Sequence, residues 1–444
     1  MLQRPAFLNQ IITDVFKRHK AVTINFGFLF FSRAIVGLIA IVSLKLLNKV
    51  FQPTELGIYA SILSLQEFVI AVVDMGVTST LTRIGSEYLL RDELLAHAFF
   101  TKVKRRRDRW GLILSCAGIF FSPIVSWILF GKMTFWFPVA LSLCLFIPLK
   151  YVSATYIGIL SAQRKFFHIG MASIIQAGIL CSGLICLLLS KESGIPMAIG
   201  IHILASIGYF VYSKVQTSDR YYNVKNYNEL LKEHISEIKR VSDSRAVIGV
   251  TNALDQPIGY TMLNHLSSSY EAGIYYCAYS IVRIVQLFTE TVSAVILPHV
   301  ARLTENTEGI HLYMKKILRL IPFGICAGIV FALVMPIAVR IFLEPKYQQA
   351  LPVAWILLIA ILPGTILNPL VLVIFPLKLE KLQMYSSILV FAVIVAIRTF
   401  LVPAFGAKGI AWSLVIGKAV AWTMLLLSIR YGLNKIERNN HDSA

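Results

Sequence analysis

Charged residues are scarce in this sequence, and acidic residues are the scarcest. Asp, Glu, Lys and Arg together make up 15% of the 444 residues, whereas hydrophobic residues make up 57%, and the mean hydropathy is +0.71. A soluble globular chain carries about 25% charged residues. The composition therefore excludes an ordinary soluble domain. It indicates a membrane protein whose spans are helices, because lipid offers the backbone no hydrogen-bond partner.

Two further absences limit the chemistry. A phosphate-binding GxxxxGK[ST] motif is lacking, since Gly417-Lys418 comes nearest and Trp412 stands where the first glycine should be. The six cysteines lie in apolar segments without a CxxC pair, and the nine histidines are scattered. We therefore expect no ATP-driven engine, disulfide, metal site or bound cofactor in this chain.

Apolar segments long enough to cross a bilayer, which takes roughly 20 residues, recur along the whole chain. The polar, basic stretch before the first of them has no small-residue cleavage site, so the first span is not a signal peptide. The twelve predicted spans cover residues 21–48, 57–80, 110–131, 134–161, 168–190, 194–214, 245–266, 273–300, 317–343, 350–376, 383–403 and 408–430.

The distribution of Lys and Arg predicts the orientation of the chain. With the N-terminus in the cytoplasm, thirty of these residues fall in inner segments and six in outer loops, a strong positive-inside bias. Both termini are therefore expected to be cytoplasmic. The net charge of +19 and the basic run Lys102–Arg109 would also suit nucleic-acid binding. That run, however, lies in a predicted inner loop beside a span, where topology and anionic lipid both favour basic residues, so we expect membrane lipids and no nucleic acid as its partners.

A short phrase occurs twice in the chain, as ELGIYA from Glu55 and as EAGIYY from Glu271, 216 residues apart. Each copy lies at the start of a predicted span, and Gly194-Ile195 and Gly409-Ile410 open two other spans at nearly the same offset. Six spans separate the members of each pair, so the two halves share one orientation. Such a parallel repeat is expected to enclose a cavity between its halves.

The longest polar segment, residues 215–244, separates an N-terminal six-helix bundle, 1–214, from a C-terminal one, 245–444. Its apolar residues fall mostly at helical spacing, opposite charged ones, which predicts an amphipathic helix on the inner membrane surface. This helix is either a tether that lets the two bundles rock or a plain interfacial linker. The fold class predicted is an all-α polytopic membrane protein.

Six basic residues remain inside the predicted spans, where each costs at least a few kcal/mol unless it faces water or a partner. Lys45 is close enough to the outer end of its span for its side chain to reach the membrane interface. Arg398 is also near the end of its span but lies deeper in the membrane. The other four lie near the middle of their spans, so we favour a water-filled cavity over pairing between helices. The candidates for binding substrate phosphate or sugar are Arg33, Lys150, Arg283, Lys418 and Arg398.

Four carboxylates share the spans with these cations. Adding the offset of 216 to Glu67 gives Arg283, and adding it to Asp74 gives Glu290, so matching faces of matching helices are charged, as a central cavity requires. A structural salt bridge between Glu67 and Arg283 is the alternative. The excess of cations over carboxylates favours an anionic substrate, because guanidinium and ammonium groups hold phosphate strongly where the dielectric constant is low.

Asp255 is the strongest of these candidates for a coupling ion, with Glu290, Asp74 and Glu67 as the others. It could bind a coupling proton or cation, and it lies two residues before Pro257, where the proline frees a carbonyl that can also coordinate the ion. Pairing with a neighbouring Arg is the equally weighted alternative.

Three stretches resemble one known family: NKVFQPTELGIYASILSLQEFVIAVVDMGVTSTLTR (48–83), YEAGIYYCAYSIVRIVQLFTETVSAVILPHVARL (270–303) and FGAKGIAWSLVIGKAVAW (405–422). They look like the Wzx-type O-antigen and polysaccharide flippases of the multidrug/oligosaccharidyl-lipid/polysaccharide (MOP) exporter superfamily, and the similarity extends over nearly the whole chain. The resemblance implies two six-helix bundles in a V-shaped, MATE-like arrangement with a cationic central cavity.

The same resemblance implies a function. A protein of this kind moves undecaprenyl-diphosphate-linked oligosaccharide, by alternating access, from the cytoplasmic to the periplasmic leaflet of a bacterial inner membrane. A proton or sodium gradient, or consumption of the product outside, would supply the energy. A polysaccharide polymerase and a chain-length regulator are the protein partners that it implies.

Two other functions are weighed against this one. A drug/cation antiporter of the same superfamily shares the architecture, but it is expected to line its cavity with acid. A membrane glycosyltransferase, polymerase or ligase would need a substantial outer loop, and no predicted outer loop here exceeds about ten residues. We therefore expect a transporter and not an enzyme.

Overall fold

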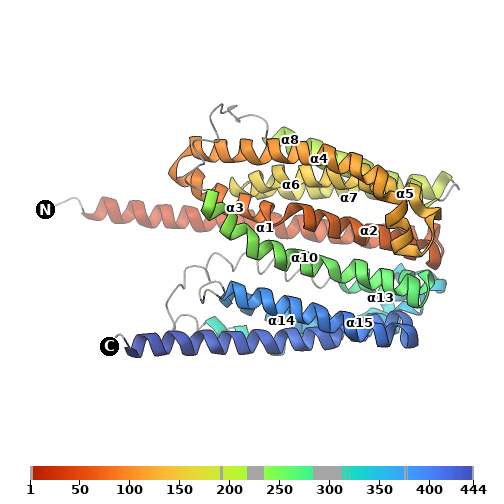
Figure 1. Ribbon diagram of the computed structural model, residues 1–444. Coiled ribbons are helices and arrows are strands. Elements are labelled where there is room, and N and C mark those ends of the chain that lie inside the picture. The colour runs from red at the N-terminus through yellow and green to blue at the C-terminus, as the bar shows by residue number, and fades with distance from the viewer. Residues whose placement is uncertain are drawn as a thin grey trace.

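The structure, a computed structural model, describes residues 4–190, 194–217, 235–283, 313–315, 317–319, 321–374, 377 and 379–442. Apart from short turns, the described residues are helical and form no strand, which confirms the all-α prediction. The helices gather in two lobes, and both termini lie at the same end of the molecule (Figure 1).

The N-terminal lobe is built from the first half of the chain. Its first helix, α1, extends well beyond the neighbouring helices at the end where the termini lie (Figure 1). Its elements are α1 (Arg4–Val50), α2 (Pro53–Asp74), α3 (Val77–Arg91), α4 (Glu93–Phe130), η1 (Met133–Phe135), α5 (Trp136–Leu141), η2 (Ser142–Phe146), α6 (Ile147–Ala162), α7 (Phe166–Ser190) and α8 (Ile195–Thr217).

The C-terminal lobe contains α10, α13, α14 and α15, with a further helical segment over residues 269–283. The long α15 includes two predicted spans and bends sharply at Gly406, whose φ of 54° lies in the left-handed region that glycine adopts at little cost. The bounds are α10 (Ile235–Leu266), α13 (Ile321–Phe342), η5 (Pro345–Tyr347), α14 (Ala350–Val371), η6 (Leu372–Ile374) and α15 (Glu380–Asp442).

Seven helices of the described residues are long and apolar enough to cross a membrane, and two shorter apolar helices accompany them. The remaining predicted spans include segments outside the described residues. The polytopic prediction is confirmed. Of the predicted linker, residues 218–234 lie outside the described part, and from Ile235 the chain is already helical and continues without interruption through α10.

Two sequence-based boundaries are wrong. The predicted span 57–80 ends at Asp74, because Met75 (φ 44°) and Gly76 (φ 71°) are both left-handed and stop the helix; the chain resumes as α3. The basic run predicted as a loop is helical, because α4 begins already at Glu93. The Asp92 carboxylate caps this helix by accepting hydrogen bonds from the backbone N–H groups of Leu94 (2.8 Å) and Leu95 (3.4 Å).

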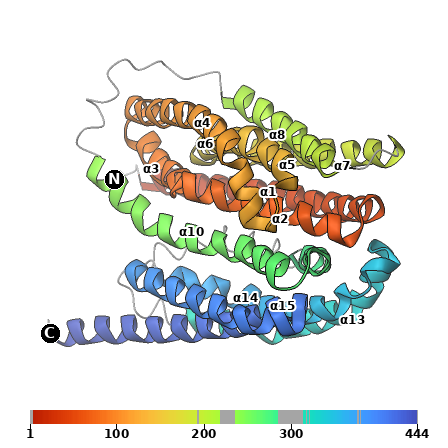
Figure 2. The same cartoon turned by 45° about the vertical axis from the view of Figure 1, so that its right-hand side comes forward.

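One hydrophobic core joins the lobes. Leu56, Tyr59 and Ile62 of α2 are buried in the same cluster as Ala272 and Ile274 of the other lobe. The α10 helix packs against both α2 and α15, and it lies along the boundary between the lobes in both views (Figures 1 and 2). The lobes are therefore held together through α2, α10 and residues 269–283, which include both copies of the repeated phrase.

Candidate functional site

The lobes are joined by an ion pair between the repeat-related residues Glu67 and Arg283. The Arg283 Nη1 lies 3.5 Å from the Glu67 Oε1, and the two side chains are 50% and 58% exposed. Each is ten residues, about 15 Å of helix, from the glycine of its ELGIYA or EAGIYY phrase. A half-exposed ion pair within apolar helices is typical of side chains that face the interior between helix bundles.

Lys150 of α6 supplies a second cation from the N-terminal lobe. Its Nζ donates a hydrogen bond to Gln176 Oε1 of α7 (2.8 Å) and lies 4.4 Å from the ring centroid of Tyr209 of α8. Its charge also interacts with Glu67. We call Glu67, Lys150 and Arg283 the central charged cluster; it contains two cations and one carboxylate, contributed by both lobes.

A distortion of the helix precedes Lys150. Residues Ser142–Phe146 form a π-helical turn between α5 and α6, which changes the direction in which the following side chains point. The turn packs tightly on α4, where a side chain at Gly118 would lie 2.8 Å from the Leu143 backbone. Such insertions are frequent at functional sites, and this one sets the face of α6 that Lys150 occupies.

Arg398, a predicted substrate-binding cation, lies instead within the C-terminal lobe. It is 1% exposed and has a polar partner at each guanidinium nitrogen: Nε donates to Ser413 Oγ (3.1 Å), Nη1 to the Asp255 carbonyl (2.7 Å), and Nη2 pairs with Asp255 Oδ1 (2.8 Å). Gly259 leaves room for the guanidinium, because a Cβ there would lie 3.3 Å from Nη1. This geometry favours the alternative in which Asp255 pairs with a neighbouring Arg, and the pair ties α10 to both parts of α15.

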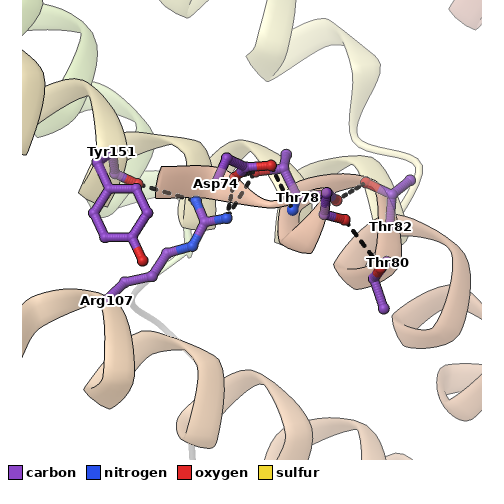
Figure 3. A network of polar contacts seen from close by, with 7 residues as sticks. Asp74, Thr78, Thr80, Thr82, Arg107 and Tyr151 are labelled. Carbon is purple, nitrogen blue, oxygen red and sulfur yellow. Dashed lines mark hydrogen bonds and ion pairs between the residues drawn. The ribbon is translucent and has the colours of Figure 1, made fainter. Parts of the chain in front are cut away.

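Asp74 also has a partner that the sequence did not reveal. Arg107 of α4, 1% exposed, pairs with the Asp74 carboxylate and donates to Thr78 Oγ1 (2.9 Å) and to the Tyr151 carbonyl (3.0 Å), with its guanidinium carbon 4.8 Å from the Tyr151 ring centroid (Figure 3). Thr78 also donates a hydrogen bond to Asp74. The Arg107 side chain thus holds the α2–α3 turn against α4 and α6.

Arg107 belongs to the basic run that the sequence assigns to membrane topology and anionic lipid. The signal in the sequence is spacing: Phe100, Arg107, Gly111 and Gly118 follow one another at intervals of four and seven residues, on one helix face, and the structure buries all four. Because its neighbours Arg105 and Arg106 are exposed, only this face of α4 turns toward the lobe.

The other predicted residues are more scattered. Arg33 lies partly exposed on α1, and Lys418 is exposed on the second part of α15. Glu290 lies outside the described residues. In the described part of the chain, no three or more His, Cys, Asp or Glu side chains gather in a way that could hold a metal ion.

Solved structures that share this fold include transporters of the MOP superfamily. An inward-facing multidrug resistance MATE family transporter superposes with a TM-score of 0.72 at 13% identity, covering 94% of this chain and 100% of its own. Lipid II flippase MurJ in an inward closed conformation gives 0.70 at 16%, covering 94% and 90%. A MOP superfamily transporter from Pyrococcus furiosus, described as having a binding pocket of reverse polarity, gives 0.69 at 12%, covering 94% and 96%. At identities this low, the superpositions show a common fold alone.

The sequence assigns the chain to a family, which is more specific than the shared fold. Residues 46–352, well over half of the chain, match the model of the family described as "Polysaccharide biosynthesis protein", and the chain belongs to that family. A comparison with curated proteins finds no match. The protein is therefore a polysaccharide biosynthesis family member with the fold of MOP superfamily transporters.

Proposed function

We propose that this protein is a flippase for undecaprenyl-diphosphate-linked oligosaccharide, the repeat unit of O-antigen or a related surface polysaccharide. The observation that carries the proposal is the central charged cluster, in which Arg283 pairs with Glu67 across the lobes and Lys150 of the N-terminal lobe interacts electrostatically with the same carboxylate. The family match supports polysaccharide biosynthesis as the setting.

The physical reasoning starts from the substrate. A diphosphate and a sugar headgroup lose their hydration when they enter hydrocarbon. The free-energy cost of that transfer is far higher than the cost of transfer to a site lined by cations. Ammonium and guanidinium groups replace that hydration with charge-assisted hydrogen bonds. The headgroup would occupy the space between the lobes, while the polyprenyl tail stays in the bilayer.

The direction of transport follows from the proposed topology. With both termini in the cytoplasm of a bacterium, the joined ends of the lobes face the periplasm, and the substrate enters from the cytoplasmic leaflet of the inner membrane. Rocking of the lobes then exposes the cluster to the other side. A proton or sodium gradient, or consumption of the product by a polysaccharide polymerase working with a chain-length regulator, supplies the driving force in this proposal.

The rival function is a drug/cation antiporter with the same fold. A site for cationic drugs would be expected to carry an excess of acid, whereas the central charged cluster carries two cations against one carboxylate. The composition of the cluster therefore favours the flippase.

The test is a deletion strain of the native host. Surface polysaccharide is scored and lipid-linked oligosaccharides are extracted for mass analysis. We expect the polymer to disappear while a lipid-linked single repeat unit accumulates, and we expect the wild-type gene, but not Arg283→Ala or Lys150→Ala, to restore the polymer. Lys132→Ala, an exposed cation outside the cluster, is the matched control.

Two results would contradict the proposal. Unchanged polymer with new sensitivity to cationic drugs would assign the protein to the antiporters. Full complementation by both Arg283→Ala and Lys150→Ala would remove the cluster from substrate binding. Collapse of the proton and sodium gradients by ionophores distinguishes the energy sources, because transport driven by product consumption continues.

A further inference from the structure

The Glu67 carboxylate occupies the position in which an anion would be bound by the central charged cluster. It lies 3.5 Å from the Arg283 guanidinium of the opposite lobe, and its charge interacts with that of Lys150 in its own lobe. The Glu67 side chain is more than half exposed and the Arg283 side chain is half exposed, so a ligand can reach both groups.

We propose that Glu67 is a built-in substitute for the ligand phosphate, which a diphosphate displaces when it binds between Arg283 and Lys150. This inference rests on the proposed function and extends it. Glu67 is then neither a ligand-binding group nor only a structural partner; it competes with the ligand for the same cations.

The competition predicts selectivity for the number of phosphate groups on the ligand. A ligand with a single phosphate group contacts one cation at a time, merely exchanges with the carboxylate of Glu67 and gains little. A diphosphate carries at least two negative charges and can contact both cations at once, so its attraction to the cluster exceeds that of the single carboxylate. The site should therefore discriminate diphosphate from monophosphate, and removal of Glu67 should weaken that discrimination.

Displacement of Glu67 by the ligand also changes the contact between the lobes. Glu67 and Arg283 belong to different lobes, and their direct ion pair is replaced by a bridge through the ligand. A neutral side chain at position 67 would remove the negative charge with which the ligand competes for Arg283. Glu67→Gln retains nearly the same volume and only removes the charge, so it separates the electrostatic role from packing.

The experiment uses the full-length protein in nanodiscs of zwitterionic lipid, so that anionic lipid headgroups do not compete. Inorganic pyrophosphate and inorganic phosphate are titrated at constant ionic strength, and ligand-induced shifts of the thermal unfolding midpoint give the affinities. We expect Glu67→Gln to bind both anions more tightly, pyrophosphate by about tenfold, with a smaller preference for pyrophosphate than the wild type shows. Glu67→Asp, which withdraws the carboxylate by one methylene, should give an intermediate affinity.

Glu87→Gln is the matched control, because it removes the carboxylate of an exposed ion pair with Arg91 in the same lobe. It should leave both affinities unchanged. Unchanged or weaker pyrophosphate binding by Glu67→Gln would overturn the inference.

Failure of the inference is distinguishable from failure of the proposed function. If Arg283→Gln abolishes pyrophosphate binding while Glu67→Gln behaves as wild type, the cluster is an anion site and only the role of Glu67 is refuted. If Arg283→Gln binds pyrophosphate as wild type does, the anion site itself is refuted. Loss of surface polysaccharide in the deletion strain reports on the proposed function independently of either result.

Discussion

Gly57 and Gly273 hold equivalent positions in the two copies of the repeated phrase, and they lie against each other where the lobes meet. A Cβ on Gly57 would overlap the Ser269 carbonyl oxygen, and a Cβ on Gly273 would overlap the Pro53 carbonyl oxygen. Glycine is required at both positions because the backbones approach too closely for any side chain. The sequence repeat thus has a structural purpose: its two copies pack on each other and close this end of the space between the lobes.

Alanine at either glycine should therefore weaken this closure. We expect Gly57→Ala and Gly273→Ala each to destabilise the joined end by about 1–3 kcal/mol, the usual cost of overpacking. Amide hydrogen exchange of peptides covering residues 51–61 and 264–274 should accelerate accordingly. Gly200→Ala, which has open space around its Cβ position, is the control, and equal exchange in all variants would show that the contact does not hold the lobes.

Asn264 adds hydrogen bonds to the same contact between the lobes. Its Nδ2 donates to Ser61 Oγ (3.0 Å) and to the Leu129 carbonyl (3.2 Å) of the other lobe, and its Oδ1 accepts from Ser269 Oγ (2.9 Å). Asn264→Ala should destabilise the contact between the lobes at this end by about 1–2 kcal/mol. Hydrogen exchange again measures the effect. Asn252→Ala, at an exposed position on the same helix, should have no effect. A comparable change in that variant would refute a specific role of the Asn264 hydrogen bonds.

Arg107→Ala should be among the most destabilising substitutions in the N-terminal lobe. It leaves the mostly buried Asp74 carboxylate without its cation, which costs about 3–5 kcal/mol when one partner of a buried pair is removed. Thermal unfolding in detergent measures the loss. Arg106→Ala removes the same side chain from an exposed neighbouring position and should be nearly neutral, so equal destabilisation by the two would contradict the structural role of Arg107.

Arg398→Lys tests the C-terminal clamp. A lysine keeps the charge but cannot contact Ser413, the Asp255 carbonyl and the Asp255 carboxylate together, so the free energy of unfolding should fall by about 2–3 kcal/mol. Arg430→Lys, exposed on the same helix, is the control. Full stability together with lost transport in Arg398→Lys would instead return Arg398 to the substrate-binding candidates.

The sequence predicted the helical membrane architecture and the relation between its halves because both depend on local and periodic features. Apolar runs must be helices in lipid, and the offset of 216 identified Glu67 and Arg283 as equivalent residues before any contact was known. It did not predict the turn at Met75–Gly76, since the uncharged stretch from Met75 to Thr82 continues across it and only the left-handed backbone there ends the helix.

What the sequence by itself determined is the class of molecule: helices in a membrane, two repeated halves, and a short set of charges too costly to bury without a reason. Which charges meet was decided by the tertiary structure alone. Arg107 and Arg398 are buried on carboxylates within their own lobes, whereas Arg283 reaches across to Glu67. The physical reason is that an ion pair depends on the distance between atoms in space, and residues 33, 143 and 216 positions apart are brought together only when helices pack.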